Sequence, residues 1–235
     1  MNVASRTHIG LVRASNQDAL LLNPGTNDLY GVADGMGGHK GGDIASLMAA
    51  SLVRRFLHGL KPSKDHLRQG IEEANLMIYE EQLYRPDLSG MGTTLTVIWE
   101  DKKRIFLGHV GDSRAYRLRG GVIQQVSQDH SMVAELVRDG LLTPEEARKH
   151  PYRNIITRAL GSSETVEVDI EEFDKRIGDI YLICSDGLSE YVQEDQMQKI
   201  LSEHDLEEAA DLFLNLALEG GGRDNISLVI AEVTA

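Results

Sequence analysis

The sequence predicts an α+β domain, and three observations support this prediction. Two amphipathic helix patterns follow one another directly, which makes a helical layer with an apolar face. Segments rich in β-branched residues come next and supply the sheet that such a layer needs to cover. The chain has 235 residues, 41% of them hydrophobic, with no internal repeat or linker, so we expect one domain over residues 1–235.

The first half of the chain is expected to hold three short strands and two helices. The strands are expected over residues 2–11, 19–22 and 29–33. The first helix is expected to be capped by Asp43, and its apolar residues at helical spacing are Ile44, Leu47, Met48, Leu52 and Phe56. The second helix begins near Ser63 and ends before Pro86, with one apolar face made of Leu67, Ile71, Ala74 and Ile78.

The second half returns to strands, which we expect over residues 92–99, 104–110, 115–118, 166–170, 179–184 and 226–233. A last helix is capped by Asp205 and ends in the glycines at 220–222. Residues 127–161 differ, because they hold short, charged elements that are more typical of a flap than of a core. One of these is a helix over 131–137, and another starts at Thr143-Pro144, a favourable cap followed by proline.

The composition disfavours several classes of protein. The formal net charge of −13 opposes binding to nucleic acid or anionic membranes, and no basic run is dense enough to offset it. The single cysteine, Cys184, cannot form an internal disulfide, which fits a reducing cytoplasm. Because no apolar run could span a bilayer and the N-terminus lacks a signal-peptide pattern, we expect a cytoplasmic protein. Nothing demands an oligomer, so we expect a monomer.

Four aspartates occupy similar positions, each at the end or the start of an expected strand and beside glycine or a tight turn. They are Asp34, Asp112, Asp186 and Asp224. Five glycines follow Asp34 within eight positions, and this run could be only a strand-to-helix connection with an ordinary turn aspartate. Four such aspartates in one domain nevertheless suggest a cluster at one rim of a sheet, where like charges would repel unless cations neutralised them.

Carboxylates without histidine or cysteine at metal-ligand spacing favour Mg²⁺ or Mn²⁺ over Zn²⁺. Two such ions can share a water and lower its pKa from about 15.7 to near 7, which supplies hydroxide at neutral pH. An arginine fork suits a phosphoryl group, because its planar donors match two phosphate oxygens. This combination indicates hydrolysis of a phosphate ester.

Seven motifs along the chain carry a family resemblance. They are Arg13…Asn16-Gln17-Asp18, Asp34-Gly35-Met36-Gly37-Gly38-His39, Met91-Gly92-Thr93-Thr94, Gly111-Asp112-Ser113-Arg114, Asp129-His130-Ser131, Ser185-Asp186-Gly187-Leu188 and Gly222-Arg223-Asp224-Asn225. In this order, and over about residues 6–233, the sequence closely resembles the metal-dependent Ser/Thr protein phosphatases (the PPM family, type 2C). It is most similar to the short bacterial members.

The resemblance implies a four-layer α-β-β-α sandwich of two antiparallel sheets, with the metal site at one end and a flap over residues 129–154. By position, Asp34 would bridge two catalytic Mn²⁺ or Mg²⁺ ions, and Gly35 would offer its carbonyl. Asp186 and Asp224 would complete the coordination of the first ion. The remaining roles implied by the resemblance are a water-mediated contact from Asp18, a third ion held by Asp112 with Asp186, and a grip on the substrate phosphate by Arg13.

Two positions depart from the family pattern. Many relatives have glutamate in place of Gln17, so one water-mediated carboxylate contact is absent and affinity for the second ion is expected to differ. Eukaryotic members often carry a histidine, a proposed general acid, near the position of Met36. His39 is the nearest candidate here; it either protonates the leaving group or orders the loop, and a metal-bound water is the other source of that proton.

Three rival classes fit less well. A cysteine phosphatase needs an arginine six residues after its thiolate, whereas Glu190 stands there after Cys184. A nucleotide-binding P-loop is absent, since the glycine run lacks a Gly-Lys-Ser/Thr ending. A metal-dependent nuclease would need a basic groove, which the acidic composition opposes.

We therefore predict an enzyme that hydrolyses phosphoserine and phosphothreonine in proteins by attack of a hydroxide bridging two Mn²⁺ or Mg²⁺ ions. Phosphorylated proteins would be its partners, and it would oppose a bacterial Ser/Thr kinase in signal transduction. The alternative is a catalytically weak phosphoprotein-binding or scaffold relative, but such proteins typically lose metal ligands that this chain retains.

Overall fold

The N-terminal half of the chain contributes most of a six-stranded sheet. The computed structural model describes residues 1–25, 27–37 and 41–234. The strand order is β2-β3-β5-β6-β9, with β4 paired to β3, and each pairing is antiparallel. The strands are β2 (Asp18–Asn23), β3 (Leu29–Met36), β4 (Gly92–Thr93), β5 (Leu95–Glu100), β6 (Arg104–Val110) and β9 (Asp169–Asp174).

The second sheet joins the first strand of the chain to its C-terminal part. Its order is β1-β11-β10-β7-β8, again antiparallel throughout. The strands are β1 (Asn2–His8), β7 (Arg114–Arg119), β8 (Val122–Gln125), β10 (Ile180–Cys184) and β11 (Ile226–Glu232). Residues from both sheets, such as Val32, Ile183 and Val229, are fully buried in one core that joins them.

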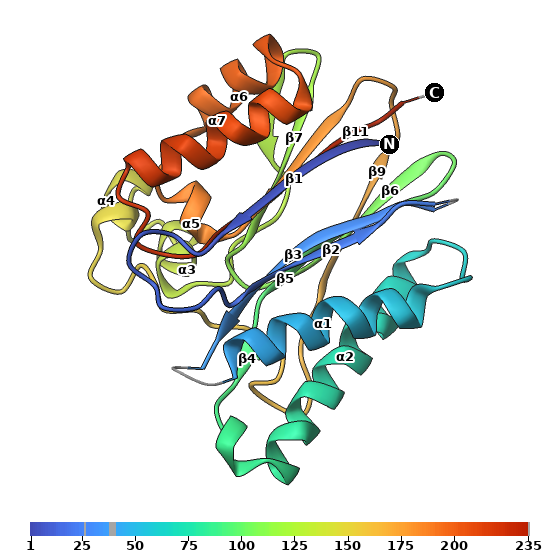
Figure 1. Cartoon of the computed structure of the whole chain (residues 1–235), viewed down its shortest axis with the longest axis vertical. Helices are drawn as coiled ribbons and strands as arrows, with labels where there is room; N and C mark the ends of the chain where they lie inside the picture. The colour runs from blue at the N-terminus through green and yellow to red at the C-terminus, as the bar shows by residue number, and fades with distance from the viewer. Residues whose placement is uncertain (26, 38–40, 235) are drawn as a thin grey trace.

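Helices cover the outer face of each sheet (Figure 1). The six-stranded sheet is covered by α1 (Gly42–Leu57) and α2 (Lys64–Tyr84), and the other by α6 (Glu194–Glu203) and α7 (Leu206–Glu219). Each helical layer has its own apolar core, with Leu67 and Ile71 on one side and Phe213 on the other. The predicted four-layer α-β-β-α sandwich is confirmed.

The helix predictions hold except at α1. Ser63 caps α2, and Thr143 begins α4 (Pro144–Lys149) with a full capping box. The predicted cap Asp43 is wrong, because Gly41 is the residue before the helix and Asp43 lies in its first turn. The predicted apolar face is also displaced. Leu47 is 59% exposed, whereas the fully buried apolar residues of α1 are Ala45, Ala49 and Val53.

Several strands and short helices differ from the sequence prediction. The strand expected over 166–170 lies at Asp169–Asp174, and β1 ends at His8 because Gly10 turns the chain at a φ of 82°. Four elements were not predicted from the sequence: β8, α6, the one-turn helix α5 (Asp186–Ser189) and the 3-10 turn η1 (Pro86–Leu88).

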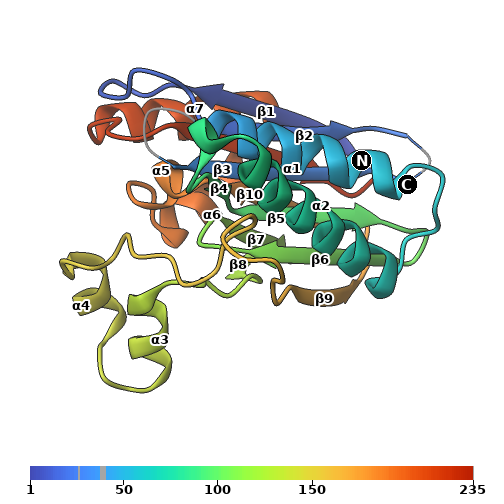
Figure 2. The same cartoon turned by 90° about the horizontal axis from the view of Figure 1, so that it is seen from below.

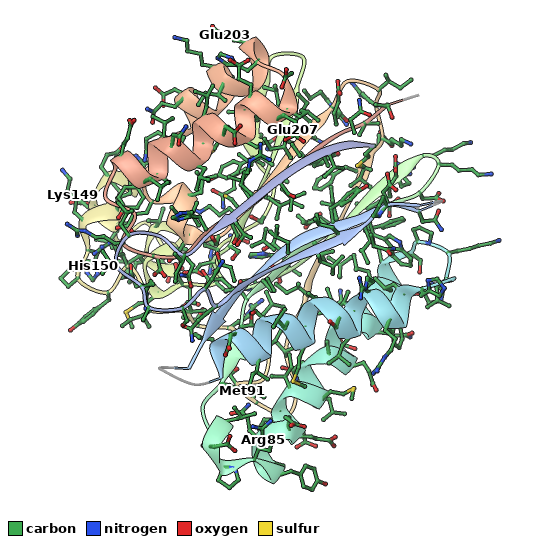
Figure 3. The ribbon with its side chains drawn as sticks, viewed as in Figure 1. Arg85, Met91, Lys149, His150, Glu203 and Glu207 are labelled. Atoms are coloured by element: carbon green, nitrogen blue, oxygen red, sulfur yellow. The ribbon has the colours of Figure 1, made fainter. Side chains whose placement is uncertain are left out.

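The predicted flap, residues 129–154, contains α3 (Met132–Arg138) and α4 and projects away from the sandwich (Figure 2). Lys149 and His150, at the end of α4, lie at the edge of the molecule (Figure 3). Among the helices that the structure describes, none has the length and apolar character to cross a membrane.

Candidate functional site: a carboxylate cluster at one end of the sandwich

The predicted aspartates come together where the two sheets meet. Asp18 and Asp34 face each other across the β2–β3 pairing. Asp186 begins α5 directly after β10, and Asp224 lies just before β11. Asp112 sits in the turn that joins β6 to β7. The cluster thus draws on both sheets, whereas the sequence pattern alone predicted a cluster at one rim of a single sheet.

Burial and mutual repulsion raise the pKa values of these carboxyl groups. Burial is the main cause that raises the pKa of Asp18 to about 7, of Asp112 to about 8 and of Asp186 to about 6. Burial, followed by the charge of Asp18, also holds the pKa of Asp34 well above its usual range. In each case a neighbouring aspartate adds repulsion, so the group as it stands carries more negative charge than the protein stabilises.

The donor set fits hard divalent cations. Asp18 Oδ1 and Asp186 Oδ1 are buried without a hydrogen-bond partner in the described part of the chain. A buried carboxylate oxygen without a partner is costly, and a cation would satisfy it and relieve the repulsion. Within the described residues, no three histidine, cysteine, aspartate or glutamate side chains already converge as a complete metal site. The fit therefore rests on the unpartnered oxygens, the repulsion and the oxygen-only donor set.

Gly35 follows Asp34 at a position where the backbone is closely approached. A Cβ there would overlap the carbonyl oxygen of Gly42 and lie 2.6 Å from the carbonyl oxygen of Gln17. The Gly35 N–H donates to that same Gln17 oxygen at 3.1 Å. Only glycine fits this crossing, which keeps the main chain of Gly35 beside Asp34.

Arg13 lies beside the cluster, in the loop after β1. Its Nη2 donates to Asp224 Oδ2 at 2.5 Å, and this bond is the main cause that raises the pKa of the Arg13 guanidinium. Asp186 and Asp34 are close enough to raise it further. About half of the Arg13 side chain is exposed, so the guanidinium borders the cluster on its solvent side.

Hydroxyl and amide side chains hold the cluster in place. The Asp34 N–H donates to Thr94 Oγ1 at 2.9 Å, Ser185 Oγ donates to Asp18 Oδ2 at 2.9 Å, and Asn225 Nδ2 donates to Ser15 O at 3.0 Å in the Arg13 loop. No role for Thr94, Ser185 or Asn225 was predicted from the sequence, although each lies in one of the seven motifs. A hydroxyl or amide side chain close in sequence to a predicted metal ligand is the feature that could have indicated such a role.

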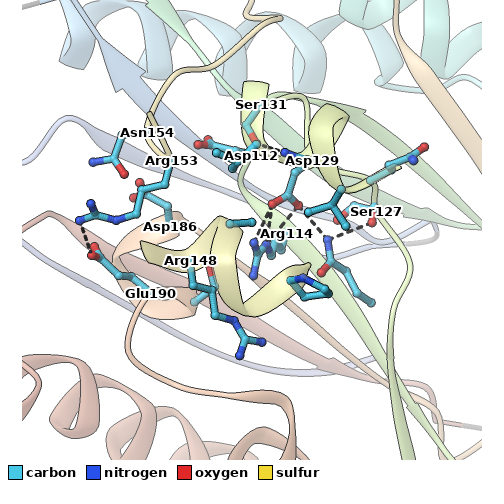
Figure 4. Close-up of a pocket in the computed structure, with 18 of the residues that line it drawn as sticks. Asp112, Arg114, Ser127, Asp129, Ser131, Arg148, Arg153, Asn154, Asp186 and Glu190 are labelled. Atoms are coloured by element: carbon cyan, nitrogen blue, oxygen red, sulfur yellow. Dashed lines mark hydrogen bonds and ion pairs between the residues drawn. The ribbon is translucent and has the colours of Figure 1, made fainter. Parts of the chain in front are cut away.

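A cavity of about 410 Å³ opens beside the cluster, between the flap and α5 (Figure 4). Asp112 and Asp186 line it from the cluster, and Val133 and Ala147 line it from the flap helices. One ion pair, Arg153 Nη2 to Glu190 Oε1 at 3.0 Å, joins the flap to the end of α5. His39, the predicted proton donor, lies outside the described residues.

Comparison with known proteins identifies the family. A family model described as protein phosphatase 2C matches residues 7–216. The serine/threonine phosphatase stp of Listeria monocytogenes is 39% identical over 243 residues, covering 99% of this chain and 96% of that protein. The serine/threonine protein phosphatase PstP of Mycobacterium tuberculosis is 41% identical over 237 residues, covering 99% of this chain. The present chain spans only 45% of the length of PstP.

Solved structures agree. The crystal structure of M. tuberculosis PstP superposes with a TM-score of 0.92 at 39% identity and covers 100% of this chain and 99% of that one. The PstP catalytic domain in complex with two manganese ions gives a TM-score of 0.89 at 38% identity, covering 100% and 98%. The fold is thus that of solved serine/threonine phosphatase structures, one of which is in complex with two manganese ions. The chain belongs to the protein phosphatase 2C family, which confirms the resemblance found in the sequence.

Proposed function

We propose that this chain is a metal-dependent phosphatase that hydrolyses phosphoserine and phosphothreonine in proteins, with residues 1–235 forming its catalytic domain. The observation that carries the proposal is the cluster around Asp34. It holds two buried carboxylate oxygens without a partner among the described residues, beside the half-exposed guanidinium of Arg13. Family membership and the names of the relatives support the substrate class.

The metal ligands are proposed as Asp34, the carbonyl of Gly35, Asp186 and Asp224, with Asp18 acting through water and Asp112 with Asp186 at a third ion. Manganese is supported by the two ions in the related PstP structure. Bound Mn²⁺ or Mg²⁺ would activate a water and neutralise charge on the phosphoryl group. Of these residues, Asp112 and Asp186 line the flap cavity, so the ions that they would hold would border it.

Arg13 is proposed to hold the substrate phosphate. A guanidinium already paired with Asp224 can turn its remaining donors toward two phosphate oxygens, in the geometry that arginine favours. In the reaction an oxygen–phosphorus bond forms from water, the bond from phosphorus to the seryl or threonyl oxygen breaks, and that oxygen takes up a proton. His39 is proposed as the proton donor on the resemblance alone.

The wider setting is also a proposal. Phosphorylated proteins are the partners that this activity requires, and a Ser/Thr kinase acting on the same substrates is the enzyme that it would oppose. We propose that the protein works in the cytoplasm as a monomer, and that the flap over residues 129–154 shapes access to the site.

The test is release of phosphate from p-nitrophenyl phosphate and from a phosphothreonine peptide, with Mn²⁺, with Mg²⁺ and with EDTA. We expect turnover with either ion and none with EDTA. Asp34→Asn, which is nearly isosteric, should abolish turnover while circular dichroism shows an unchanged fold. Well-folded wild-type protein that releases no phosphate with either ion would reject the proposal and favour the phosphoprotein-binding alternative.

A further inference from the structure

The turn that carries Asp112 is held by the first residues of the flap. Gly111 N–H donates to His130 Nδ1 at 3.0 Å, and His130 N–H donates to Gly111 O at 2.8 Å. One flap residue therefore holds both polar backbone groups of the residue before Asp112. Gly111 has a φ of 112°, and a Cβ there would lie 2.5 Å from Thr94 Cγ2, so this backbone has little freedom.

The imidazole of His130 is oriented by a second partner. Because the Gly111 N–H is the donor, Nδ1 must be the unprotonated nitrogen, and Nε2 then carries the hydrogen. Nε2 lies 3.1 Å from Asp169 Oδ2 on β9, which accepts its hydrogen. Arg158 Nη1 lies 3.2 Å from the same Nε2 and donates to Asp169 Oδ1 at 3.0 Å. His130 is only 3% exposed, so the link from the partly exposed Asp169 to Gly111 passes through a buried imidazole.

The flap also holds the other side of the same turn. Arg114, two residues after Asp112, donates from Nε and Nη2 to Asp129 Oδ2 at 2.9 and 2.7 Å. Figure 4 shows Asp112, Arg114 and Asp129 around the same cavity, with Asp186 opposite. Asp112 is thus the central residue of a turn whose two flanks are both bonded to residues 129–130.

We propose that His130 is a positioning residue: its Nδ1 bond to the Gly111 N–H sets the direction of the Asp112 carboxylate and so couples the flap to the ion site that Asp112 shares with Asp186. This inference rests on the proposed function, because it takes Asp112 as a metal ligand. The group that acts is the hydrogen-bond acceptor at Nδ1, which distinguishes this role from general packing.

Two substitutions of His130 separate these roles. In His130→Asn, the amide oxygen stands near the position of Nδ1 and keeps an acceptor for Gly111. In His130→Gln, the longer side chain can reach Asp169 but leaves the Gly111 N–H without its acceptor. Asp112→Asn defines the loss of the ion site itself. Asp179→Asn is the matched control, because it disrupts a buried ion pair with Arg119 on the far end of the sheet.

The measurement is Mn²⁺ binding by isothermal titration calorimetry, with steady-state kinetics alongside. We expect His130→Gln to weaken the ion site that Asp112→Asn removes by about 10- to 100-fold, the range for residues that orient a ligand. His130→Asn should stay within about threefold of wild type, and Asp179→Asn should bind every ion normally. Hydrogen exchange of the Gly111 amide should quicken in His130→Gln and stay slow in His130→Asn.

Asp169→Ala is a second route if His130→Gln is poorly folded. The Asp169 side chain contacts the turn through His130 and is partly exposed, so we expect a smaller loss at the same ion site that is not additive with His130→Gln. Wild-type Mn²⁺ binding in His130→Gln, or in Asp112→Asn, would overturn the inference. Failure of the proposed function would be seen elsewhere, as a wild-type protein without metal-dependent turnover.

Discussion

At the scale of single residues, Arg13 has two partners to contact, a carboxylate of the cluster and the proposed substrate phosphate. Its guanidinium pairs with Asp224, which we propose as a metal ligand, and it is also the proposed grip on the substrate phosphate. A cation at Asp224 would compete with the guanidinium for the same carboxylate. Ion binding and release of Arg13 toward the substrate are therefore expected to be linked.

Arg13→Ala tests this link. We expect KM for a phosphothreonine peptide to rise about 10- to 100-fold, since a hydrogen bond between charged groups contributes about 1.5–3 kcal/mol. The same variant should bind Mn²⁺ at least as tightly as wild type, because the competing cation is gone. Arg6→Ala is the control, as Arg6 makes comparable ion pairs with Glu207 and Asp211. An unchanged KM would show that Arg13 does not contact the phosphate.

Loss of Asp186 should also be severe, because this residue, like Asp34, is proposed to serve two ions. Asp186→Asn preserves the size of the side chain but removes the charge of the carboxylate. The Oδ1 of this carboxylate has no hydrogen-bond partner among the described residues. We expect kcat to fall by at least about 100-fold, with weaker Mn²⁺ binding at both sites. Asp211→Asn, on the exposed face of α7, should leave both quantities unchanged. Retained turnover of Asp186→Asn with saturating Mn²⁺ would contradict the proposed ligand set.

The sequence predicted the carboxylates but could not predict what orients them. An aspartate beside glycine at the end of an expected strand is visible as a local pattern, and Asp34, Asp112 and Asp186 each fit it. Thr94, Ser185 and His130 act through contacts with residues far away in the chain, such as Asp34, Asp18 and Gly111. Local spacing holds no information about such contacts.

At the scale of elements, α1 shows why the buried face of a helix can differ from the face that its apolar spacing predicts. The expected face used the largest side chains, yet Ala45, Ala49 and Val53 are the fully buried residues. Small residues allow the helix to approach the sheet closely, while the larger Ile44, Met48 and Phe56 pack at the partly exposed edge of the same core. Periodicity predicted the helix, and close packing decided which residues face inward.

The β3–α1 connection depends on Gly35, and Gly35→Ala tests that dependence. The added methyl group would overlap Gly42 O and crowd Gln17 O, both of which are backbone atoms that cannot move aside cheaply. We expect the free energy of unfolding to fall by about 1–3 kcal/mol or more, together with weaker Mn²⁺ binding. Chemical denaturation measures the first quantity. Gly25→Ala, at a position with open space and, like Gly35, without a positive φ, shows how much of the loss comes from replacing glycine alone. Equal losses in the two variants would contradict the close-approach argument.

Apart from α6, the elements that were not predicted from the sequence are short. β8 has four residues and pairs only with β7, and α5 is a single turn. β9 pairs with β6 at the edge of its sheet, where the ion pair of Arg104 with Asp174 lies at one end of the register. Pairing with a distant strand determines these boundaries, whereas the apolar residues Val166 and Val168 suggested an earlier one.

At the scale of the whole molecule, the site exists only because two sheets stack. Asp18 and Asp34 belong to one sheet, whereas Asp186 and Asp224 adjoin strands of the other. Composition and periodicity cannot show that strand ends separated by more than a hundred residues meet in space. The ordered set of motifs supplied that information through the family resemblance, and the sandwich confirms it.

This convergence of charge makes folding and ion binding depend on pH together. Without ions, the pKa values of Asp18, Asp34, Asp112 and Asp186 are raised, whereas in the unfolded chain an aspartate has a pKa of about 3.9. As pH falls from 8 to 5.5, the folded protein takes up protons that the unfolded chain does not. The ion-free protein therefore gains stability from these groups at lower pH. Ions need the same carboxylates deprotonated, so protons and Mn²⁺ compete.

The expected outcome is a Tm shift by Mn²⁺ that is larger at pH 8 than at pH 5.5. At a concentration of about 100 times Kd, one bound ion contributes about 2.7 kcal/mol, and each tenfold loss of affinity at lower pH removes about 1.4 kcal/mol. Differential scanning fluorimetry with Mn²⁺ and with EDTA at both pH values measures the difference. The pKa of His109, lowered to about 4 mainly by burial, opposes the aspartates, but it acts in both samples and cancels. Because the four carboxylates form one electrostatic group, Asp34→Asn should reduce the dependence on pH as well as the shift itself. An Mn²⁺ shift of equal size at the two pH values would mean that the ions do not bind at this cluster.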